Sequence, residues 1–229
     1  GCELGVQGQY GEIHLLGLWL PRHSAPLDAE LARLRGHREE RNLKILDRLR
    51  SIGINIGYQE VLDEAGGESV GRPHIARVLQ KRGIVSNFVQ AFELYLGYYG
   101  AAYVPRTLLT PEEGVSLMAD LGAVVSFAHP MLIRCPPSWF DEIIPRLKEA
   151  GLGAIEAYHS EHSARDERFC VELAARYGLG LSGGSDYHGM AKPGVELGRG
   201  KGGLRVTVAL LDALKARRKR PVDDAPEVL

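Results

Sequence analysis

The alternation of strand-type and helix-type segments after residue 110 places the strongest constraint on the fold of this chain. Apolar runs of strand length alternate there with capped amphipathic segments. The pattern predicts strands at 123–128, 153–158 and 179–182, and helices at about 110–121, 138–150 and 163–177. Strands that alternate with helices in this way predict an α/β fold with a parallel sheet or barrel.

Capping residues support the predicted ends of these helices. Thr110 and Glu113 form a capping-box pattern, and Ser163 predicts a second N-cap. Gly151 and Gly178 predict the points at which two helices end. A last helix is predicted near 208–217, followed by the basic run Arg217-Arg218-Lys219-Arg220, which we interpret as a solvated terminus.

The first part of the chain has a different pattern. Residues 2–6 and 12–18 are typical of two strands, whereas 27–106 contain helical patterns and no strand pattern. We therefore predict a sheet domain formed by 1–26 and 107–229, interrupted by a helical insertion at 27–106. Within the insertion, Leu43, Leu46, Leu49 and Ile52 recur at three-residue spacing in a predicted helix, which Gly53 is expected to end, and Ser86 is expected to cap a later helix.

Composition excludes several classes of protein. The 28 Lys and Arg residues balance 29 Asp and Glu residues, so the net charge of −1 gives no general attraction to nucleic acid or to an anionic membrane. No apolar run approaches the roughly 20 residues needed to span a bilayer. The three cysteines, Cys2, Cys135 and Cys170, share no CxxC spacing, which favours a reduced, cytoplasmic protein with free thiols.

Histidine and carboxylate side chains fall in or directly after the predicted strands. The set is Glu3, His14, His129, His159, Asp186 and His188. The carboxyl ends of parallel strands share one edge, where active sites form, so these groups are expected to converge. Imidazole and carboxylate together suit Zn²⁺, Mn²⁺ or Fe. Taken singly, His14 in an apolar strand is also compatible with an ordinary core histidine.

Four motifs resemble one known family, the PHP-domain metallophosphoesterases, and in particular its nucleoside 3′,5′-bisphosphate phosphatases and 5′→3′ exoribonucleases. The resemblance extends from Gly1 to about Leu214. Its motifs are Gly1-Cys2-Glu3-Leu4 followed by Glu12-Ile13-His14-Leu15-Leu16-Gly17, then Gly71-Arg72-Pro73-His74-Ile75-Ala76-Arg77, Ala128-His129-Pro130, and Ser185-Asp186-Tyr187-His188-Gly189.

The resemblance implies a distorted (β/α)₇ barrel with up to three divalent metal ions. Mn²⁺ is the expected metal, with Zn²⁺ or Fe as alternatives. The resemblance makes Glu3 a bridging ligand, joins it with His14 and His129 on one metal, and assigns Asp186 to a second and His188 to a third. It implies that a metal-activated hydroxide attacks a phosphate ester of a small nucleotide or of the 5′ end of short RNA.

Several cations are candidates for binding the substrate phosphate, because guanidinium groups match phosphate geometry. They are Arg72, His74, Arg106 and Arg134, and His159 is a further candidate contact. Each is also compatible with a surface, capping or structural role. His23, His37 and His162 are interpreted as ordinary polar residues.

The sequence departs from the family pattern before Glu3. The family carries a strand with a His-x-His pair and two further ligands there, and this chain has none of them. We therefore expect a fragment of a longer protein, with an incomplete barrel and weak activity. An inactive PHP-like module that binds a partner or nucleic acid is the alternative. A barrel that hydrolyses C–N bonds is less favoured, because Lys148, Lys192 and Lys201 fall in predicted helix or loops.

Overall fold

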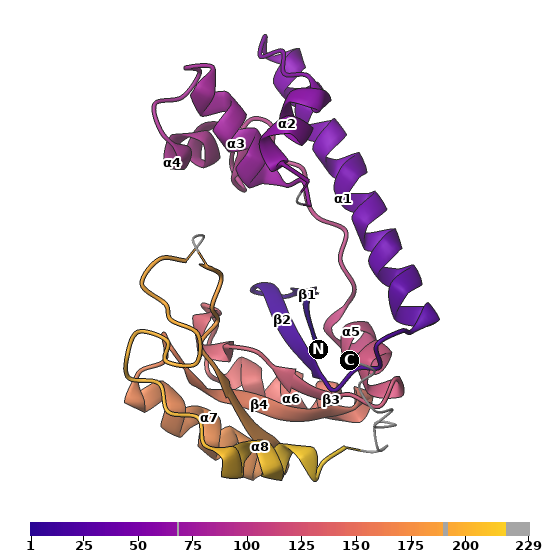
Figure 1. Cartoon of the computed structure of the whole chain (residues 1–229), viewed down its shortest axis with the longest axis vertical. Helices are drawn as coiled ribbons and strands as arrows, with labels where there is room; N and C mark the ends of the chain where they lie inside the picture. Colours follow the sequence, from indigo (N-terminus) through magenta and orange to yellow (C-terminus); the bar gives the residue numbers. More distant parts are fainter. Residues whose placement is uncertain (68, 190–191, 219–229) are drawn as a thin grey trace, which may run out of the picture. The chain divides into compact units, whose positions relative to one another are not determined.

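The computed structural model describes residues 1–67, 69–189 and 192–218 (Figure 1). Lys219 and Arg220 of the predicted basic run lie outside the described residues. The chain divides into two compact units, one formed by Gly1–Leu27 with Leu108–Leu229 and the other by Asp28–Thr107. In the described residues, no helix is both long and apolar enough to cross a bilayer.

The first unit is built on one open, five-stranded mixed sheet. Its strands are adjacent in chain order: β1 (Cys2–Gly8), β2 (Gly11–Leu18), β3 (Val124–Phe127), β4 (Leu152–His159) and β5 (Gly180–Gly184). β3, β4 and β5 are parallel, as the alternating pattern predicts. β1 and β2 pair antiparallel, and β2 pairs antiparallel with β3.

The antiparallel strip corrects the expectation of a wholly parallel sheet. Only Gln9 and Tyr10 separate β1 from β2, and Gly8 pairs with Gly11. A two-residue connection permits only a hairpin, because parallel strands need a crossover of a dozen or more residues. Gly11 has φ +131°, a backbone conformation that favours glycine. The sheet is therefore α/β in class, but its N-terminal edge is a hairpin.

Helices cover the sheet and provide the apolar core. α5 (Pro111–Asp120) packs on β1, β2 and β3, and α6 (Ser138–Ala150) and α7 (Ala164–Tyr177) pack on β4. The buried aromatic rings of Phe127, Trp139 and Phe140 lie in contact between sheet and helices. α8 (Val208–Lys215) packs on β5, and its Leu214 contacts Val124 and Ala154.

The capping signals of the first unit are confirmed. Thr110 and Glu113 form a reciprocal box at the start of α5, and Ser163 forms one with Asp166 at the start of α7. Gly151 and Gly178 end α6 and α7 in the left-handed conformation. These local signals fix where each helix meets the strand that follows it.

The second unit is a small helical domain with its own core. It contains most of α1 (Ala25–Ser51), then α2 (Tyr58–Ala65), α3 (Arg72–Lys81), α4 (Phe88–Ala91) and a π-helical turn, η1 (Phe92–Leu96). The core joins Leu46 and Leu49 to apolar side chains of α2, α3 and η1.

One detail of the helical insertion, a helix cap, differs from the prediction. In α1, Ile45, Leu46 and Leu49 are buried in the core, whereas Leu43 and Ile52 are exposed. A three-residue spacing drifts around a helix of 3.6 residues per turn, so Leu43 and Ile52 lie on opposite sides of it. The N-cap of α4 is Asn87 rather than Ser86, because the Asn87 side chain accepts from the Gln90 N–H at 2.9 Å.

A buried hydroxyl pair gives a direct test of the sheet. Ser126 Oγ and Ser182 Oγ lie 2.7 Å apart, and both residues are buried. Ser126→Ala leaves the Ser182 hydroxyl without its partner, so we expect the free energy of unfolding to fall by about 1–3 kcal/mol. The double variant Ser126→Ala/Ser182→Ala should lose less than the sum of the two single losses. Denaturant melts of the four proteins measure this coupling, and strictly additive losses contradict it.

Candidate metal centre

The hairpin register places Glu3 and His14 on the same face of the sheet. Gly5 pairs with His14 and Glu3 pairs with Leu16, and side chains of paired residues share a face. Residues two apart on one strand also share a face, so Glu3, Gly5, Glu12 and His14 lie together. The opposite face of the hairpin is apolar and buried, and it carries Leu4, Val6, Ile13 and Leu15.

His129 reaches this face from the end of β3. The Ala128 N–H donates to the His14 carbonyl at 2.9 Å, which continues the β2–β3 pairing by one step. His129 itself has φ +28°, a conformation that is unusual for a residue with a side chain. Its backbone N–H donates to Glu156 Oε2 at 2.7 Å, and this contact holds the turn.

Glu3, His14 and His129 form the one group of three candidate metal ligands within the described residues. Glu3 Oε1 lies 2.8 Å from His14 Nδ1 and 3.4 Å from His129 Nε2, and the two ring nitrogens are 3.2 Å apart. Ligand atoms at about 2.0–2.2 Å from one ion are separated by roughly 3–3.5 Å in tetrahedral or octahedral geometry. The donor set and its spacing therefore fit a single divalent ion.

Hydrogen bonds within the cluster shift the pKa values of Glu3 and His14 in opposite directions. Hydrogen bonds from His129 and then His14 hold the pKa of Glu3 far below its usual range. Hydrogen bonds to Glu12 and then Glu3 raise the pKa of His14 to about 9. Because a metal ligand must be deprotonated, a divalent ion binds here in competition with a proton on His14.

Glu12 is a second-layer residue that the sequence analysis missed. Its Oε1 lies 3.6 Å from His14 Nε2, the ring nitrogen that faces away from Glu3. A carboxylate on the outer nitrogen of a ligating histidine fixes the ring and its tautomer. Gly5 makes this contact possible, because a Cβ at that position collides with Glu12 Oε1. The signal in the sequence was the Glu-x-His spacing on one strand.

Glu156 is the second residue that the sequence analysis missed. It is 4% exposed, and burial raises its pKa to about 7 despite the hydrogen bond from the His129 N–H. A carboxylate in the otherwise apolar strand 153–158 was the available signal. The contact positions His129 from the neighbouring strand.

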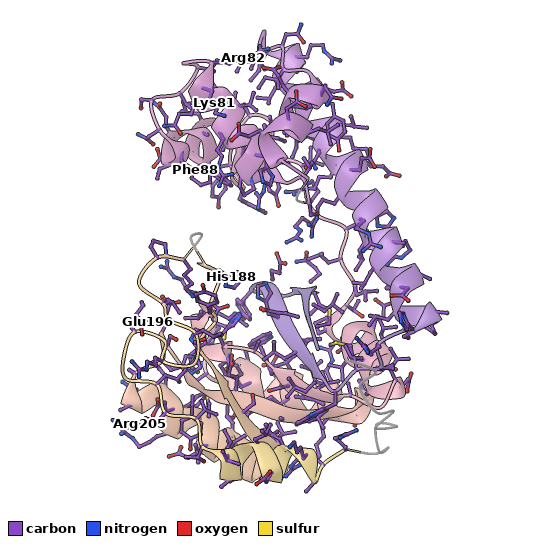
Figure 2. The ribbon with its side chains drawn as sticks, in the orientation of Figure 1. Lys81, Arg82, Phe88, His188, Glu196 and Arg205 are labelled. Carbon is purple, nitrogen blue, oxygen red and sulfur yellow. The ribbon has the colours of Figure 1, made fainter. Side chains whose placement is uncertain are left out.

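Asp186 and His188 form a separate pair on the segment that leaves β5. His188 Nδ1 lies 3.2 Å from Asp186 Oδ1, and Asp186 Oδ2 lies 2.6 Å from Lys192 Nζ. The His188 side chain is exposed (Figure 2). Neither residue joins the three-ligand group in the described part of the chain. Their assignment to second and third metals stays a prediction.

His159 lies between the cluster and Asp186. Its ring centroid is 5.4 Å from that of His129, and its Nε2 is 3.7 Å from Asp186 Oδ2. The Glu161 N–H donates to His159 Nδ1, so the proton of the neutral ring is on Nε2. That nitrogen is buried and has no hydrogen-bond partner within the described residues.

The other predicted substrate contacts occupy different environments. Arg134 is exposed after the 3₁₀ turn η2 (Pro130–Leu132) in the first unit. The helical unit contains Arg72, His74 and Arg106. Arg72 donates to the Leu96 carbonyl at 2.9 Å and stacks on Phe92, and His74 Nδ1 accepts from the Gly71 N–H. Their roles in substrate binding stay predictions.

Comparison with known proteins identifies the relatives of this chain. No protein-family model matches it. It is 29% identical to the 5′-3′ exoribonuclease Rnm of Escherichia coli over 200 residues, which cover 87% of the chain and 68% of that protein. It is 27% identical to the 3′,5′-nucleoside bisphosphate phosphatase of Chromobacterium violaceum over 224 residues, which cover 97% of the chain and 79% of that protein.

Solved structures agree with the sequence comparison. A Bifidobacterium adolescentis protein assigned as a metal-dependent phosphoesterase matches with a TM-score of 0.76 and 26% identity, over 94% of this chain and 75% of that one. The chain is related to the PHP-domain metal-dependent phosphoesterases. A C. violaceum protein described as an amidohydrolase, with bound sulfate and no metal, matches with a TM-score of 0.74 and 26% identity, over 96% of this chain and 77% of that one.

The PHP relationship predicted from the four motifs is therefore confirmed. The relatives named for their activity are hydrolases of phosphoric esters. Within the described residues, the barrel predicted from the resemblance is not closed, and five strands form an open sheet.

Metal affinity tests the cluster directly. His129→Ala and Glu3→Gln each remove a ligand, so we expect Mn²⁺ or Zn²⁺ binding measured by titration calorimetry to weaken by at least about tenfold. Gly5→Ala displaces Glu12 and should weaken binding by about 10–100-fold, the range for second-layer residues. The exposed His23→Ala is the matched control. Unchanged affinity in His129→Ala contradicts the assignment.

The buried Glu156 predicts a pH dependence of stability. Its pKa rises from an ordinary 4.5 to about 7, so between these values the folded state holds a proton that the unfolded state has lost. Its contribution to stability is full below about pH 4.5 and falls by roughly 3 kcal/mol as pH rises to about 7. Glu156→Gln should remove this fall. Urea melts of the metal-free proteins at pH 5 and 7.5 measure it, and an identical pH response of both proteins refutes it.

Proposed function

We propose that this chain is the larger part of a metal-dependent phosphoesterase that hydrolyses phosphate esters of small nucleotides or of the 5′ end of short RNA. The observation that carries the proposal is the cluster of Glu3 with His14 and His129, whose atoms are spaced for one divalent ion. Two relatives, an exoribonuclease and a nucleoside bisphosphate phosphatase, support the class of substrate.

Three residues of the chain would ligate the ion, and two others would position the ligands. Glu3 supplies the carboxylate, His14 Nδ1 and His129 Nε2 supply the nitrogens, and Glu12 and Glu156 hold the two histidines in place. A divalent ion bound there supplies Lewis acidity and an activated hydroxide for attack on phosphorus. Mn²⁺ is our expected metal, and Zn²⁺ or Fe fits the same donors.

Two further groups are suited to the substrate phosphate. Burial lowers the pKa of His159 to about 4, so its ring is neutral near pH 7 and its Nε2–H is a donor without a partner in the described residues. Arg134 is exposed, with no side-chain partner in the described part of the chain, and its planar guanidinium matches a phosphate. We propose that His159 and Arg134 bind phosphoryl oxygens. Arg72, His74 and Arg106 remain candidates from the helical unit.

The proposed complete fold is the distorted (β/α)₇ barrel, with the five strands described above as part of its wall. The second and third metals would use Asp186 and His188 with ligands outside these 229 residues. The E. coli relative supports this view, because the chain covers 68% of its length.

Two alternatives use the same fold. An inactive module that binds a partner or nucleic acid predicts no hydrolysis even when the upstream residues of the gene product are included. A C–N hydrolase is compatible with the relative described as an amidohydrolase. It is disfavoured because none of the five strands contains a lysine that could bridge two metals.

Hydrolysis by a longer form of the gene product tests the function. With Mn²⁺, we expect release of phosphate from a nucleoside 3′,5′-bisphosphate or of mononucleotides from 5′-phosphorylated RNA, at least about 100-fold above His129→Ala. The 229-residue chain should be much weaker, and His23→Ala should match the unaltered protein. Full activity of the 229-residue chain contradicts the need for further ligands. Inactivity of every longer form contradicts the proposed function.

A further inference from the structure

The segment between β5 and α8 contains a polar pocket that the proposed function does not use. Residues of the segment 194–205, which we call the 194–205 loop, line a half-open pocket of about 440 Å³. Three cations, Arg199, Lys201 and Arg205, and one carboxylate, Glu196, line it. Figure 2 shows Glu196 and Arg205 on this loop, which follows the His188 segment.

Two of the three cations of the pocket are available to a ligand. Arg199 and Arg205 are exposed, and neither guanidinium has a side-chain partner within the described residues. Lys201 is paired with Glu161 at 2.9 Å. The pocket is therefore net positive in a chain whose overall net charge is −1. Two guanidinium forks in one cavity match the oxygens of a phosphate diester.

Backbone hydrogen bonds hold the loop in a fixed shape. Glu196 and Gly200 exchange N–H to carbonyl bonds at 2.8 and 2.9 Å, and the Gly202 N–H donates to the Arg199 carbonyl at 2.9 Å. Gly200 has φ +59° and packs on Ser160 so closely that a side chain there collides with Oγ. The pocket is therefore formed before any ligand arrives, which lowers the entropic cost of binding.

The loop is attached to the same sheet edge that carries His159 and Asp186. The Gly198 N–H donates to Ser185 Oγ at 3.3 Å, and Ser160 Oγ donates to the Ser185 carbonyl at 2.7 Å. A chain of ion pairs also joins Lys201 to Glu161, Glu161 to Lys192, and Lys192 to Asp186. A ligand in the pocket is thus bound to a part of the molecule that is fixed relative to the proposed reaction site.

We propose that the 194–205 loop is a second anion site, which binds an internucleotide phosphate of a ribonucleotide chain whose 5′ end lies at the metal cluster. The inference rests on the proposed function and deepens it. A mononucleotide has no internucleotide phosphate, so the site favours short RNA over a nucleoside bisphosphate. Arg199 and Arg205 bind the phosphate, and Lys201 fixes the loop to the sheet edge.

Binding of labelled RNA without metal tests the site. The labelled ligand is a 5′-phosphorylated tetraribonucleotide, and its binding is measured by fluorescence anisotropy in EDTA. Unlabelled nucleoside 3′,5′-bisphosphate and inorganic phosphate are the competitors. The variant Arg199→Gln/Arg205→Gln is set against Arg165→Gln/Arg168→Gln, which removes two exposed charges from α7. We expect the loop variant to bind the tetranucleotide about tenfold more weakly, with a log–log salt slope smaller by about 0.7, the value for one phosphate contact on a single strand. The α7 variant should retain the affinity of the unaltered chain.

The outcomes separate this inference from the proposed function. Equal tetranucleotide affinity in the two double variants overturns the site. The site is also overturned if the loop variant loses as much affinity for inorganic phosphate as for the tetranucleotide, because the pocket then binds the free ion. A retained loop effect in a protein without hydrolysis refutes the proposed function but supports the site. If the double loop variant unfolds early in a thermal melt, Arg199→Gln and Arg205→Gln singly should each weaken tetranucleotide binding and lower the salt slope by less than about 0.7.

Discussion

One carboxylate oxygen, Oε1 of Glu3, lies within 3.4 Å of nitrogen atoms on two imidazole rings that come from different strands. Hydrogen bonds from the two rings stabilise the carboxylate in this arrangement, and a divalent cation can take the place of their protons. Three strands of the first unit and two further carboxylates bring these groups together. The hairpin places Glu3 beside His14, and His129 follows directly after β3. The exposed Glu12 contacts the His14 ring, and the buried Glu156 accepts from the His129 N–H.

Individual groups, rather than the net charge of the chain, determine where an anion can bind. Because the net charge is −1, a phosphate is attracted by placed groups and not by the field of the whole protein. Those groups are the Nε2–H of His159, which ends β4, and the cations of the 194–205 loop. The carboxylate of Asp186, which follows β5, repels an anion unless a cation is bound beside it. The ion-pair chain through Glu161 and Lys192 joins the two regions.

The sequence predicted the parts of the fold that local rules determine. Thr110 and Ser163 cap helices as expected, and the runs around Val125, Ile155 and Leu181 form parallel strands. The hairpin direction of β1 and β2 was not predicted, although the two-residue connection required it. The residue pattern alone predicted the cluster only as a convergence of strand ends, and the family resemblance joined Glu3, His14 and His129 on one metal. The supporting carboxylates Glu12 and Glu156 were missed because their roles depend on cross-strand register.

The most direct test of the account is an anomalous-difference map from a crystal of this chain grown with Mn²⁺. The account predicts a peak at about 2.0–2.2 Å from Glu3 Oε1, His14 Nδ1 and His129 Nε2 together. No peak there, with Mn²⁺ bound elsewhere or not at all, would contradict the central claim that these three residues form a metal centre.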